Sequence, residues 1–529
     1  MSVTHSPARA IGGMVAAAHP LAAAAGAEIM RSGGNAYDAA VATVSTLNVV
    51  EPYMSGLAGL GAATCWVAAE NRMRCLDFTP PVPSKFLAEG VHKEDINTGA
   101  MASGVPGNLA GWCTLLDTYG TKPLAEVLQP AIRHAREGFP VSALYALMAE
   151  MTATRASTPE WQAVYATGDG TVNEGWVLKQ PRLAETYEAI ASEGVAYLHG
   201  GALGKAMVDH LGSLGGCLTM ADLEAVEPEW QEPLGAAYRD LVINVPPPPS
   251  EAFQFPLTMR ILDGFDLAAM EHLGADHLDR VLRSIRLAAE TRITNNNRTV
   301  AEIEALMTED AVAPLRDRIL DPSPITARTE QFGDAPSPEV AEARSHTTSV
   351  SIADSDGNMV CITQSLGSPW GSSVVIPETG VCMNNFLNWG DLNKASPNFM
   401  IGGKRWAMCL TPSISTRDGA PVLALGTPGS YGIMQTQTQA LVHYVDYGLN
   451  LRQAIEGPRA RLYDGRRVVL EDRVAPDVVE ELRRRGHEIE LPGPFTMQCG
   501  GMQAVSRDPS TGALAGTADP RRDGSAVGV

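Results

Sequence analysis

The sequence predicts a fold that mixes α-helices and β-strands, and three observations support it. Residues 347–365 alternate apolar and polar side chains on both sides of a turn, which is typical of a β-hairpin. The runs 63–67 and 73–78 are strand-like as well, with a polar turn between them. Small apolar residues at helical spacing predict helices at 22–30 and 35–50. Strands in the middle of the chain with helices on both sides indicate one mixed fold.

The rest of the chain extends this pattern. At 529 residues it is long enough for several domains, yet no linker separates two cores, so we expect one globular unit. Residues 150–300 are expected to be mainly helical, and residues 321–345, rich in proline, serine, alanine and charge, predict an exposed connector. Further strands are predicted at 373–376, 381–384, 412–416 and 422–425, and further helices at 434–447 and 478–485.

Composition excludes several classes of function. Hydrophobic residues make up 45% of the chain and charged residues 19%, which is ample material for a core. A formal charge of -20 argues against a nucleic-acid partner. The eight cysteines form no Cys-x-x-Cys pair and no zinc-like cluster, so we expect neither a metal nor another cofactor. Without a secretory pattern or a span-length apolar stretch, no membrane partner is expected, and the expected location is cytoplasmic.

The register of the predicted hairpin gathers hydroxyl groups around Thr347. Counting outward by equal steps from a turn centred on Asp356 places Thr347 opposite Ser365, and Ser349 opposite Thr363 on the same face. Threonine at the start of a strand is also ordinary β-propensity, so this cluster alone does not indicate catalysis.

Five short motifs occur in a fixed order along the chain: His346-Thr347-Thr348, Asp356-Gly357-Asn358, Asn384-Asn385, Thr427-Pro428-Gly429 and Asp519-Pro520-Arg521-Arg522-Asp523-Gly524. In this order they resemble motifs of the γ-glutamyltransferase family of N-terminal-nucleophile hydrolases, and the resemblance covers nearly the whole chain. It implies a four-layer αββα sandwich. It also implies that the precursor cuts itself between His346 and Thr347. The large fragment, 1–346, and the small fragment, 347–529, would then form one globular heterodimer.

The resemblance assigns catalytic roles to four residues. A threonine hydroxyl is a weak nucleophile unless a base lies beside it, and the α-amine of Thr347 becomes such a base only after cleavage. With a reference pKa of about 8, this amine is partly free near neutral pH, and the precursor is predicted to be inactive. Ser365, where family members carry threonine, is expected to orient the Thr347 hydroxyl. Gly429 and Ser430 match the position of two backbone N–H groups that bind the oxyanion of the acyl-enzyme.

The groups with which family members hold a glutamate head group are replaced here. In the family an arginine, two serines, an asparagine, a glutamine and an aspartate bind it. The corresponding positions in this chain are, in the same order, Thr79, Met408 and Cys409, Gly367, Phe386 and Trp389. Arg74 or Asp391 could offset one such loss, but losing all of them leaves a charged head group unpaired, at a cost of roughly several kcal/mol. Together with Thr363, the replacements other than Gly367 are predicted to line the substrate pocket.

The predicted function is therefore hydrolysis of an amide of a small acyl substrate, oxamate-like or glutaryl-like, through an acyl-enzyme. Two alternatives remain open. One is a true γ-glutamyltransferase or glutathione hydrolase, and the other is a non-catalytic relative that keeps the fold as a binding protein. The sequence also leaves open whether water or an amine accepts the acyl group.

Overall fold

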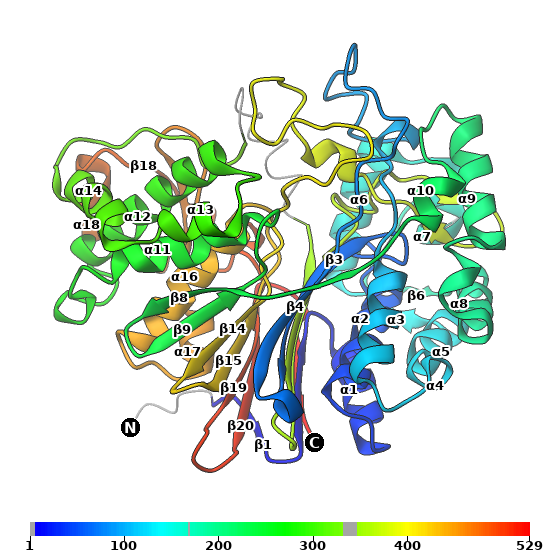
Figure 1. Cartoon of the computed structure of the whole chain (residues 1–529), viewed down its shortest axis with the longest axis horizontal. Helices are drawn as coiled ribbons and strands as arrows, with labels where there is room; N and C mark the ends of the chain where they lie inside the picture. The colour runs from blue at the N-terminus through cyan, green and yellow to red at the C-terminus, as the bar shows by residue number, and fades with distance from the viewer. Residues whose placement is uncertain (1–5, 168–169, 332–345) are drawn as a thin grey trace.

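Two antiparallel seven-stranded sheets lie face to face between two layers of helices (Figure 1). The structure is a computed structural model that describes residues 6–167, 170–331 and 346–529. In Figure 1 the helices form groups on the left and right, and the strands run between them. The predicted four-layer αββα sandwich is confirmed.

The first sheet contains the predicted hairpin at its centre. Across the sheet the strands are β21 (Ser525–Gly528), β2 (Gly13–Ala17), β10 (Thr348–Asp354), β11 (Met359–Ser365), β3 (Leu60–Val67), β4 (Arg72–Phe78) and β7 (Glu229–Gln231). The predicted register holds, because Ser349 pairs with Thr363. The predicted hairpin of β3 and β4 is confirmed as well.

The second sheet is formed by β1 (Ala8–Ala10), β20 (Leu514–Ala518), β19 (Gln503–Arg507), β15 (Ala420–Gly426), β14 (Ser413–Arg417), β9 (Leu241–Val245) and β8 (Leu234–Tyr238). The expectation that residues 150–300 are mainly helical is wrong for 229–245, which form β7, β8 and β9. β7 and β8 are short, and β8 contains glycine and alanine, so these two strands carry little strand propensity. The sequence of β9, with two valines and an isoleucine, does favour a strand. β7 and β8 are edge strands, whereas β9 lies between β14 and β8.

The two sheets pack through β10 and β11 on one side and β15 and β19 on the other. The apolar residues between them include Met14, Ala16, Trp66, Ala353, Cys361, Ile414, Ala424 and Val505. Ser349 and Ser351 also point into this layer, where both donate hydrogen bonds to Gln503, one to its side chain and one to its backbone carbonyl. Odd-numbered residues of β10 therefore face the second sheet.

The first helical layer covers the outer face of the β10 sheet. Its central helix is α2 (Ala36–Val50), which is buried at every position and lies against β10 and β11. The Asn35 side chain caps its start, and Glu51 is the residue at its C-terminal end. The other helices of this side are α1 (Pro20–Arg31), α3 (Asn108–Tyr119), α4 (Leu124–Val127), α5 (Gln129–Glu137), α6 (Ala143–Ala156), α7 (Pro159–Tyr165), α8 (Pro181–Glu193), α9 (Ala202–Ser213) and α10 (Met220–Glu224).

The second helical layer covers the β15 sheet, with α11 in contact with β8 and α16 with β15. It comprises α11 (Gln254–Leu262), α12 (Ala275–Asn295), α13 (Val300–Ala305), α14 (Glu309–Leu320), α16 (Gly432–Val445), α17 (Leu451–Glu456) and α18 (Pro476–Arg484). Three short strands join this layer: β16 (Ala460–Leu462), β17 (Arg467–Leu470) and β18 (Glu488–Glu490). Two small pairs complete the fold: β5 (Phe139–Pro140) with β6 (Val177–Leu178), and β12 (Val375–Ile376) with β13 (Val381–Cys382).

The predicted exposed connector is only partly correct. Residues 321–324 are exposed, but Thr329 and Glu330 are buried. Arg292 donates hydrogen bonds to both of their carbonyls, and Arg461 forms an ion pair with the Glu330 carboxylate. Residues 332–345 lie outside the described residues. The connector is thus fixed to the second helical layer shortly before the predicted cleavage point.

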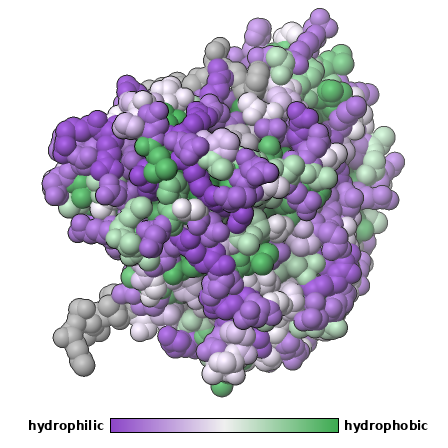
Figure 2. Space-filling view, turned by 60° about the vertical axis from the view of Figure 1, so that its left-hand side comes forward, coloured by the Kyte–Doolittle hydropathy of each residue, from purple (hydrophilic) through white to green (hydrophobic). Residues whose placement is uncertain are grey.

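The surface is mainly hydrophilic, and apolar residues form small separate groups on the face in Figure 2. Within the described ranges, no helix is both long and apolar enough to cross a membrane. All eight cysteines are free thiols; Cys113 and Cys217 are partly exposed and the other six are buried.

Candidate active site

The bond between His346 and Thr347 lies in a buried cluster of hydroxyl groups. Thr347 directly precedes β10 and Ser365 ends β11, as the register predicted. The Thr347 hydroxyl donates to the carbonyl oxygen of His346 at 2.6 Å, and the Ser365 hydroxyl donates to the same oxygen at 2.9 Å. The two hydroxyl oxygens are 3.4 Å apart. The Gly367 N–H donates to Ser365 Oγ at 2.9 Å, so the serine side chain is held in place.

This arrangement suits an attack by Thr347 on its own preceding peptide. The Thr347 hydroxyl oxygen is held beside the carbonyl group, and the Ser365 hydroxyl donates to the oxygen that would become negative during attack. Thr347, His346 and Ser365 are each 3% exposed or less, so little water competes for these hydrogen bonds.

The turn with Gly429 and Ser430 follows β15 and is positioned by that strand. Gly426 packs so closely on Ser349 that a β-carbon there would lie 3.0 Å from the serine Cβ. The turn beyond it has positive φ at Gly429 (130°) and Ser430 (58°), which points successive N–H groups in unusual directions. Neither N–H donates a hydrogen bond to another described residue. Both predicted donors are thus available for a ligand.

A buried wall connects Ser365 with this turn. Gly367 has φ 101°, and a β-carbon there would lie 3.2 Å from Trp389 Nε1 and would also meet the Asn385 side chain. The Trp389 ring packs against Tyr431, which follows Ser430, with 5.9 Å between ring centroids. Trp389 therefore occupies the space that a larger residue at position 367 would need.

Phe386 and Trp389 belong to one short 3-10 helix, Phe386–Trp389, that begins directly after Asn385. Both side chains are buried, and so is Thr363, two residues from Ser365 on the same strand. Among the described residues, Trp389 Nε1 and the hydroxyls of Thr363 and Ser430 have no hydrogen-bond partner. The structure brings these predicted site residues into one region and leaves three buried donors unused.

Thr79 and Met408 lie together in a different place, beside a small cavity that Asp77 and Trp406 also line. Thr79 is two strands away from Ser365 across β3, or about 10 Å at the usual strand spacing. Its hydroxyl donates to the Asp77 carboxylate, and Arg405 pairs with Asp77 at 2.5 Å. Burial raises the pKa of Asp77, and the charge of Arg405 opposes that rise.

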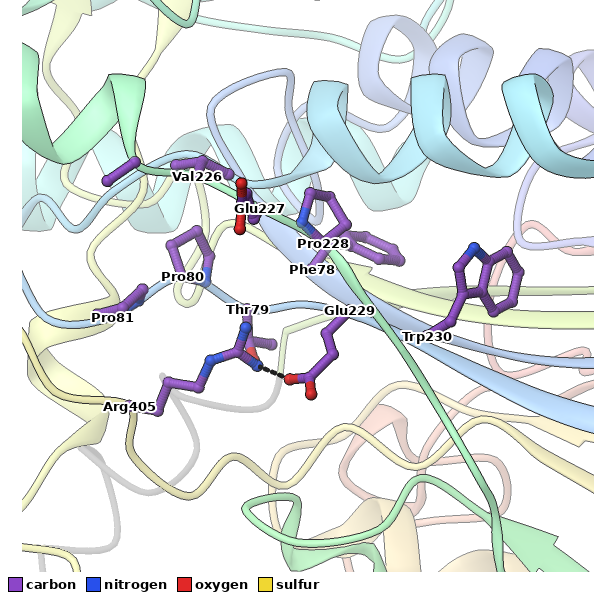
Figure 3. A pocket seen from close by; sticks show the side chains of 11 residues that line it. Phe78, Thr79, Pro80, Pro81, Val226, Glu227, Pro228, Glu229, Trp230 and Arg405 are labelled. Carbon is purple, nitrogen blue, oxygen red and sulfur yellow. Dashed lines mark ion pairs between the residues drawn. The ribbon is translucent and has the colours of Figure 1, made fainter.

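A cavity of about 470 Å³ opens beyond Thr79 (Figure 3). Arg405 points toward Glu229 across it, with 3.5 Å between the charged atoms. Glu227 and several prolines line the same cavity. Arg405 is thus the cation beside Thr79, but two carboxylates already surround it. This cavity resembles a polar entrance more than an empty anchor for a glutamate head group.

Cys409 faces a buried ion pair that the sequence did not reveal. Burial and the nearby Glu251 carboxylate raise the pKa of its thiol. Glu251 pairs with Arg292 at 2.7 Å, and the Arg292 guanidinium lies 4.3 Å from the centre of the Tyr431 ring.

Arg74 and Asp391 were considered as substitutes for a lost anchor, but both already have partners. Arg74 donates a hydrogen bond to Tyr119, and Asp391 accepts one from Ser396.

Comparisons with known proteins identify the family. The family model described as Gamma-glutamyltranspeptidase matches residues 22–529. The chain belongs to this family. The Acylase ACY 1 proenzyme of Pseudomonas sp. (strain V22) is 33% identical over 540 residues, which cover 99% of this chain and 94% of the relative. The Glutathione hydrolase proenzyme of Bacillus subtilis (strain 168) is 29% identical, with 98% and 91% covered.

Among solved structures, the cephalosporin acylase from Bacillus halodurans matches with a TM-score of 0.90 and 28% identity, covering 100% of this chain and 98% of that one. The full-length relatives are hydrolase proenzymes, and the chain is accordingly an amide hydrolase of this family. Acylases and glutathione hydrolases match at similar identity, so identity alone does not select between their substrates.

Some of the family motifs have structural roles. Asn384 donates to the carbonyls of Ala58 and Gly104 and accepts from the Gly104 N–H, so it fixes the glycine-rich turn before β3. Asn385 makes similar contacts with Ser368 on the loop after β11. These two asparagines hold the loops around the site rather than presenting free groups to a ligand.

The sequence analysis missed Glu51 and Arg522, two buried charged residues near the predicted cleavage point. Glu51 accepts a hydrogen bond from the Thr348 hydroxyl at 2.6 Å, and burial raises its pKa to about 7 despite the charge of Arg522. Burial lowers the pKa of His346 well below its usual range, and the charges of Arg522 and Arg155 lower it further. The sequence signals were present, because Arg522 belongs to the last motif and Glu51 ends a predicted helix, but neither had an assigned role.

Proposed function

We propose that this chain is a self-cleaving amide hydrolase whose nucleophile is Thr347 and whose substrate carries a small acyl group with acceptor oxygens. The observation that carries the proposal is the contact of the Thr347 hydroxyl with the carbonyl oxygen of His346 at 2.6 Å, together with the Ser365 donor on that same oxygen. If Thr347 were only structural, the second hydroxyl, from Ser365, at the same carbonyl oxygen would have no function.

Cleavage starts with attack of Thr347 Oγ1 on the carbonyl carbon of His346. The new oxygen–carbon bond replaces the carbon–nitrogen bond, and the hydroxyl proton passes to the departing nitrogen. Ser365 stabilises the negative oxygen during this exchange. Water then hydrolyses the resulting ester, which frees the His346 carboxylate and restores the Thr347 hydroxyl beside its own α-amine.

The two fragments, 1–346 and 347–529, stay together because their strands alternate in both sheets. In the first sheet β2, from the large fragment, lies between β21 and β10, from the small one. In the second sheet β1, β8 and β9 of the large fragment flank β14, β15, β19 and β20. Separation would break five rows of backbone hydrogen bonds, so a heterodimer is the expected product of cleavage.

Turnover uses the same hydroxyl with a new base. The free α-amine of Thr347 takes the hydroxyl proton as Oγ1 attacks the substrate amide. The N–H groups of Gly429 and Ser430 stabilise the oxyanion, the amine leaves with a proton, and water releases the acyl group. Their freedom from other described partners supports this role.

The wall beyond Ser365 favours a small acyl group. Trp389 fills the space beside Gly367, and Met408 and Cys409 are both buried. Trp389 Nε1 and the hydroxyls of Thr363 and Ser430 are buried donors without described partners, and each unmet donor costs about 1–3 kcal/mol. Carbonyl or carboxylate oxygens of an oxamate-like or glutaryl-like group would satisfy them.

The second candidate is glutathione hydrolysis, which the Bacillus subtilis relative favours by name. Side-by-side kinetics on γ-glutamyl-p-nitroanilide, oxamate and glutaryl amides separate the two. We expect at least tenfold higher kcat/KM for one of the latter pair, a difference of about 1.4 kcal/mol. Efficient turnover of the γ-glutamyl compound, with the other two inert, would overturn the small-acyl assignment.

Self-cleavage is tested with Thr347→Ala. This variant should stay full length on a denaturing gel, whereas the wild type should give a small fragment whose first residue is Thr347. Thr347→Ser keeps a hydroxyl and serves as the matched control that still cuts. A cut Thr347→Ala protein, or a small fragment that begins elsewhere, would refute the nucleophile.

A further inference from the structure

Two buried charges of opposite sign lie beside the bond that is cut, and neither takes part in the steps above. Glu51, at the end of α2, is 1% exposed, and Arg522, shortly before β21, is 6% exposed. The charge of Arg522 acts on both Glu51 and His346, while Glu51 is bonded to the hydroxyl of Thr348, the residue after the nucleophile. Arg522 donates a hydrogen bond to the sulfur of Met54 at 3.0 Å, and the backbone carbonyl of Met54 accepts one from Leu366, the residue after Ser365.

Self-cleavage places two new charges in this buried region. The intact peptide between His346 and Thr347 is neutral, and its hydrolysis yields a carboxylate on His346 and an ammonium group on Thr347. Both residues are 3% exposed or less before the cut. Isolated charges are unfavourable in such surroundings unless partners of opposite sign are close. The His346 side chain offers no help, because burial keeps it neutral.

We propose that Glu51 and Arg522 are positioning residues that stabilise the two termini created by cleavage, Glu51 the ammonium group of Thr347 and Arg522 the carboxylate of His346. This inference rests on the proposed self-cleavage at Thr347. Glu51 comes from the large fragment and Arg522 from the small one, so each new terminus meets an opposite charge supplied by the other fragment.

The same pair then tunes the catalytic amine. An anionic Glu51 favours the ammonium form and raises the pKa of the Thr347 amine, whereas a cationic Arg522 lowers that pKa. Since only the free amine acts as the base, activity is lost as the pH falls through this pKa. Removal of Glu51 should therefore extend activity to lower pH, and removal of Arg522 should restrict it to higher pH.

Other charged and titratable groups face the pair and belong to the same balance. They are Tyr53 after α2, Arg155 in α6, His346, and Asp519 and Asp523 on either side of Arg522. None of these is changed in the variants below. The opposite signs of the two shifts therefore isolate the pair from its surroundings.

The test compares Glu51→Gln and Arg522→Gln with the wild type in the processed full chain. The kcat/KM profile is measured from pH 5 to 10 on the better of the oxamate and glutaryl amides. We expect the acid limb to move down by about one pH unit in Glu51→Gln and up by about one unit in Arg522→Gln. Shifts in the same direction, or no shift in either, would overturn the proposal, because a structural role has no reason to move the limbs apart.

If a glutamine variant is obtained mainly as the uncut precursor, the rate at which it cuts itself is measured instead. Glu51→Asp and Arg522→Lys keep the charges and should cut within about tenfold of the wild type, while the glutamine variants should be about a hundredfold slower, in line with the loss of one charged partner. Equal rates in charge-keeping and charge-removing variants that are folded by circular dichroism would overturn the proposal. Cutting of Thr347→Ala would instead remove the proposed function, so the two failures are distinct.

Discussion

The predicted cleavage point at Thr347 and the buried wall beyond Ser365, which contains Phe386 and Trp389, lie next to each other. They differ in how many of the residues typical of the family they keep. At the predicted cleavage point, the hydroxyls of Thr347 and Ser365 both donate to one carbonyl oxygen, so neither hydroxyl is left unpaired. Along the wall, Trp389 and Phe386 fill the space, and buried donors have no described partner. The two hydroxyls of the first region are paired within the chain, whereas those of Thr363 and Ser430 in the second region are not.

This difference separates chemistry from recognition. The proposed attack of Thr347 on the preceding peptide uses only atoms of the chain, and the two hydroxyls involved are already paired. Substrate recognition needs groups that remain unpaired until a ligand arrives, and the unused donors of the wall meet that description. Replacement of the wall residues changes the acyl group without touching the cleavage cluster, because the two sets share only the short segment from Ser365 to Gly367.

The largest effect is expected from Ser365→Ala. It removes the donor 2.9 Å from the carbonyl oxygen of His346 and leaves the Gly367 N–H without its acceptor. Loss of one oxyanion donor typically costs about 10²-fold or more, so cutting should slow at least a hundredfold. A gel time course of the precursor measures it, with Ser365→Thr as the control that keeps the hydroxyl. Cutting of Ser365→Ala at the wild-type rate would show that the cluster is only structural.

The cleavage cluster could be predicted because it depends on local rules. Alternation along two adjacent strands and a short turn fix which residues face each other, and the predicted pairing of Ser349 with Thr363 is what the sheet contains. The helices with clear caps, such as α2 after Asn35, were predicted for the same reason. Local sequence patterns were therefore sufficient to predict these parts of the fold.

The parts that were missed depend on contacts between distant segments. The strands in 229–245 are short and hold their place through neighbours in the sheet, and the connector is buried because Arg292 binds its carbonyls. Glu51 and Arg522 come from opposite ends of the chain, and nothing in one sequence says that they meet. Counting from motifs selected Thr79 but could not show that it lies two strands away from Ser365.

Gly429→Ala is expected to lower kcat about tenfold and to leave the rate of self-cleavage nearly unchanged. The added β-carbon has room, 3.5 Å from Gly500, but φ of 130° is strained for alanine by about 1–3 kcal/mol, which should displace the two N–H groups. Cutting depends on Ser365 instead and should stay within about twofold of the wild type. Gly448→Ala, at another positive-φ glycine with open space around it, controls for strain alone. An equal loss of kcat and of cutting rate would show that the two regions do not have separate roles.

The smallest effect is expected from Trp389→Phe, which tests whether the wall recognises acceptor oxygens. Phenylalanine keeps the ring against Tyr431 and removes only the Nε1 donor. One hydrogen bond contributes about 1 kcal/mol net, so KM for the preferred small acyl amide should rise about fivefold, with kcat and cutting nearly unchanged. Trp161→Phe is the matched control, because its Nε1 is also buried without a described partner but lies in α7. An unchanged KM in Trp389→Phe, or an equal rise in the Trp161 variant, would mean that the wall excludes by shape and that its unused donors do not select the substrate.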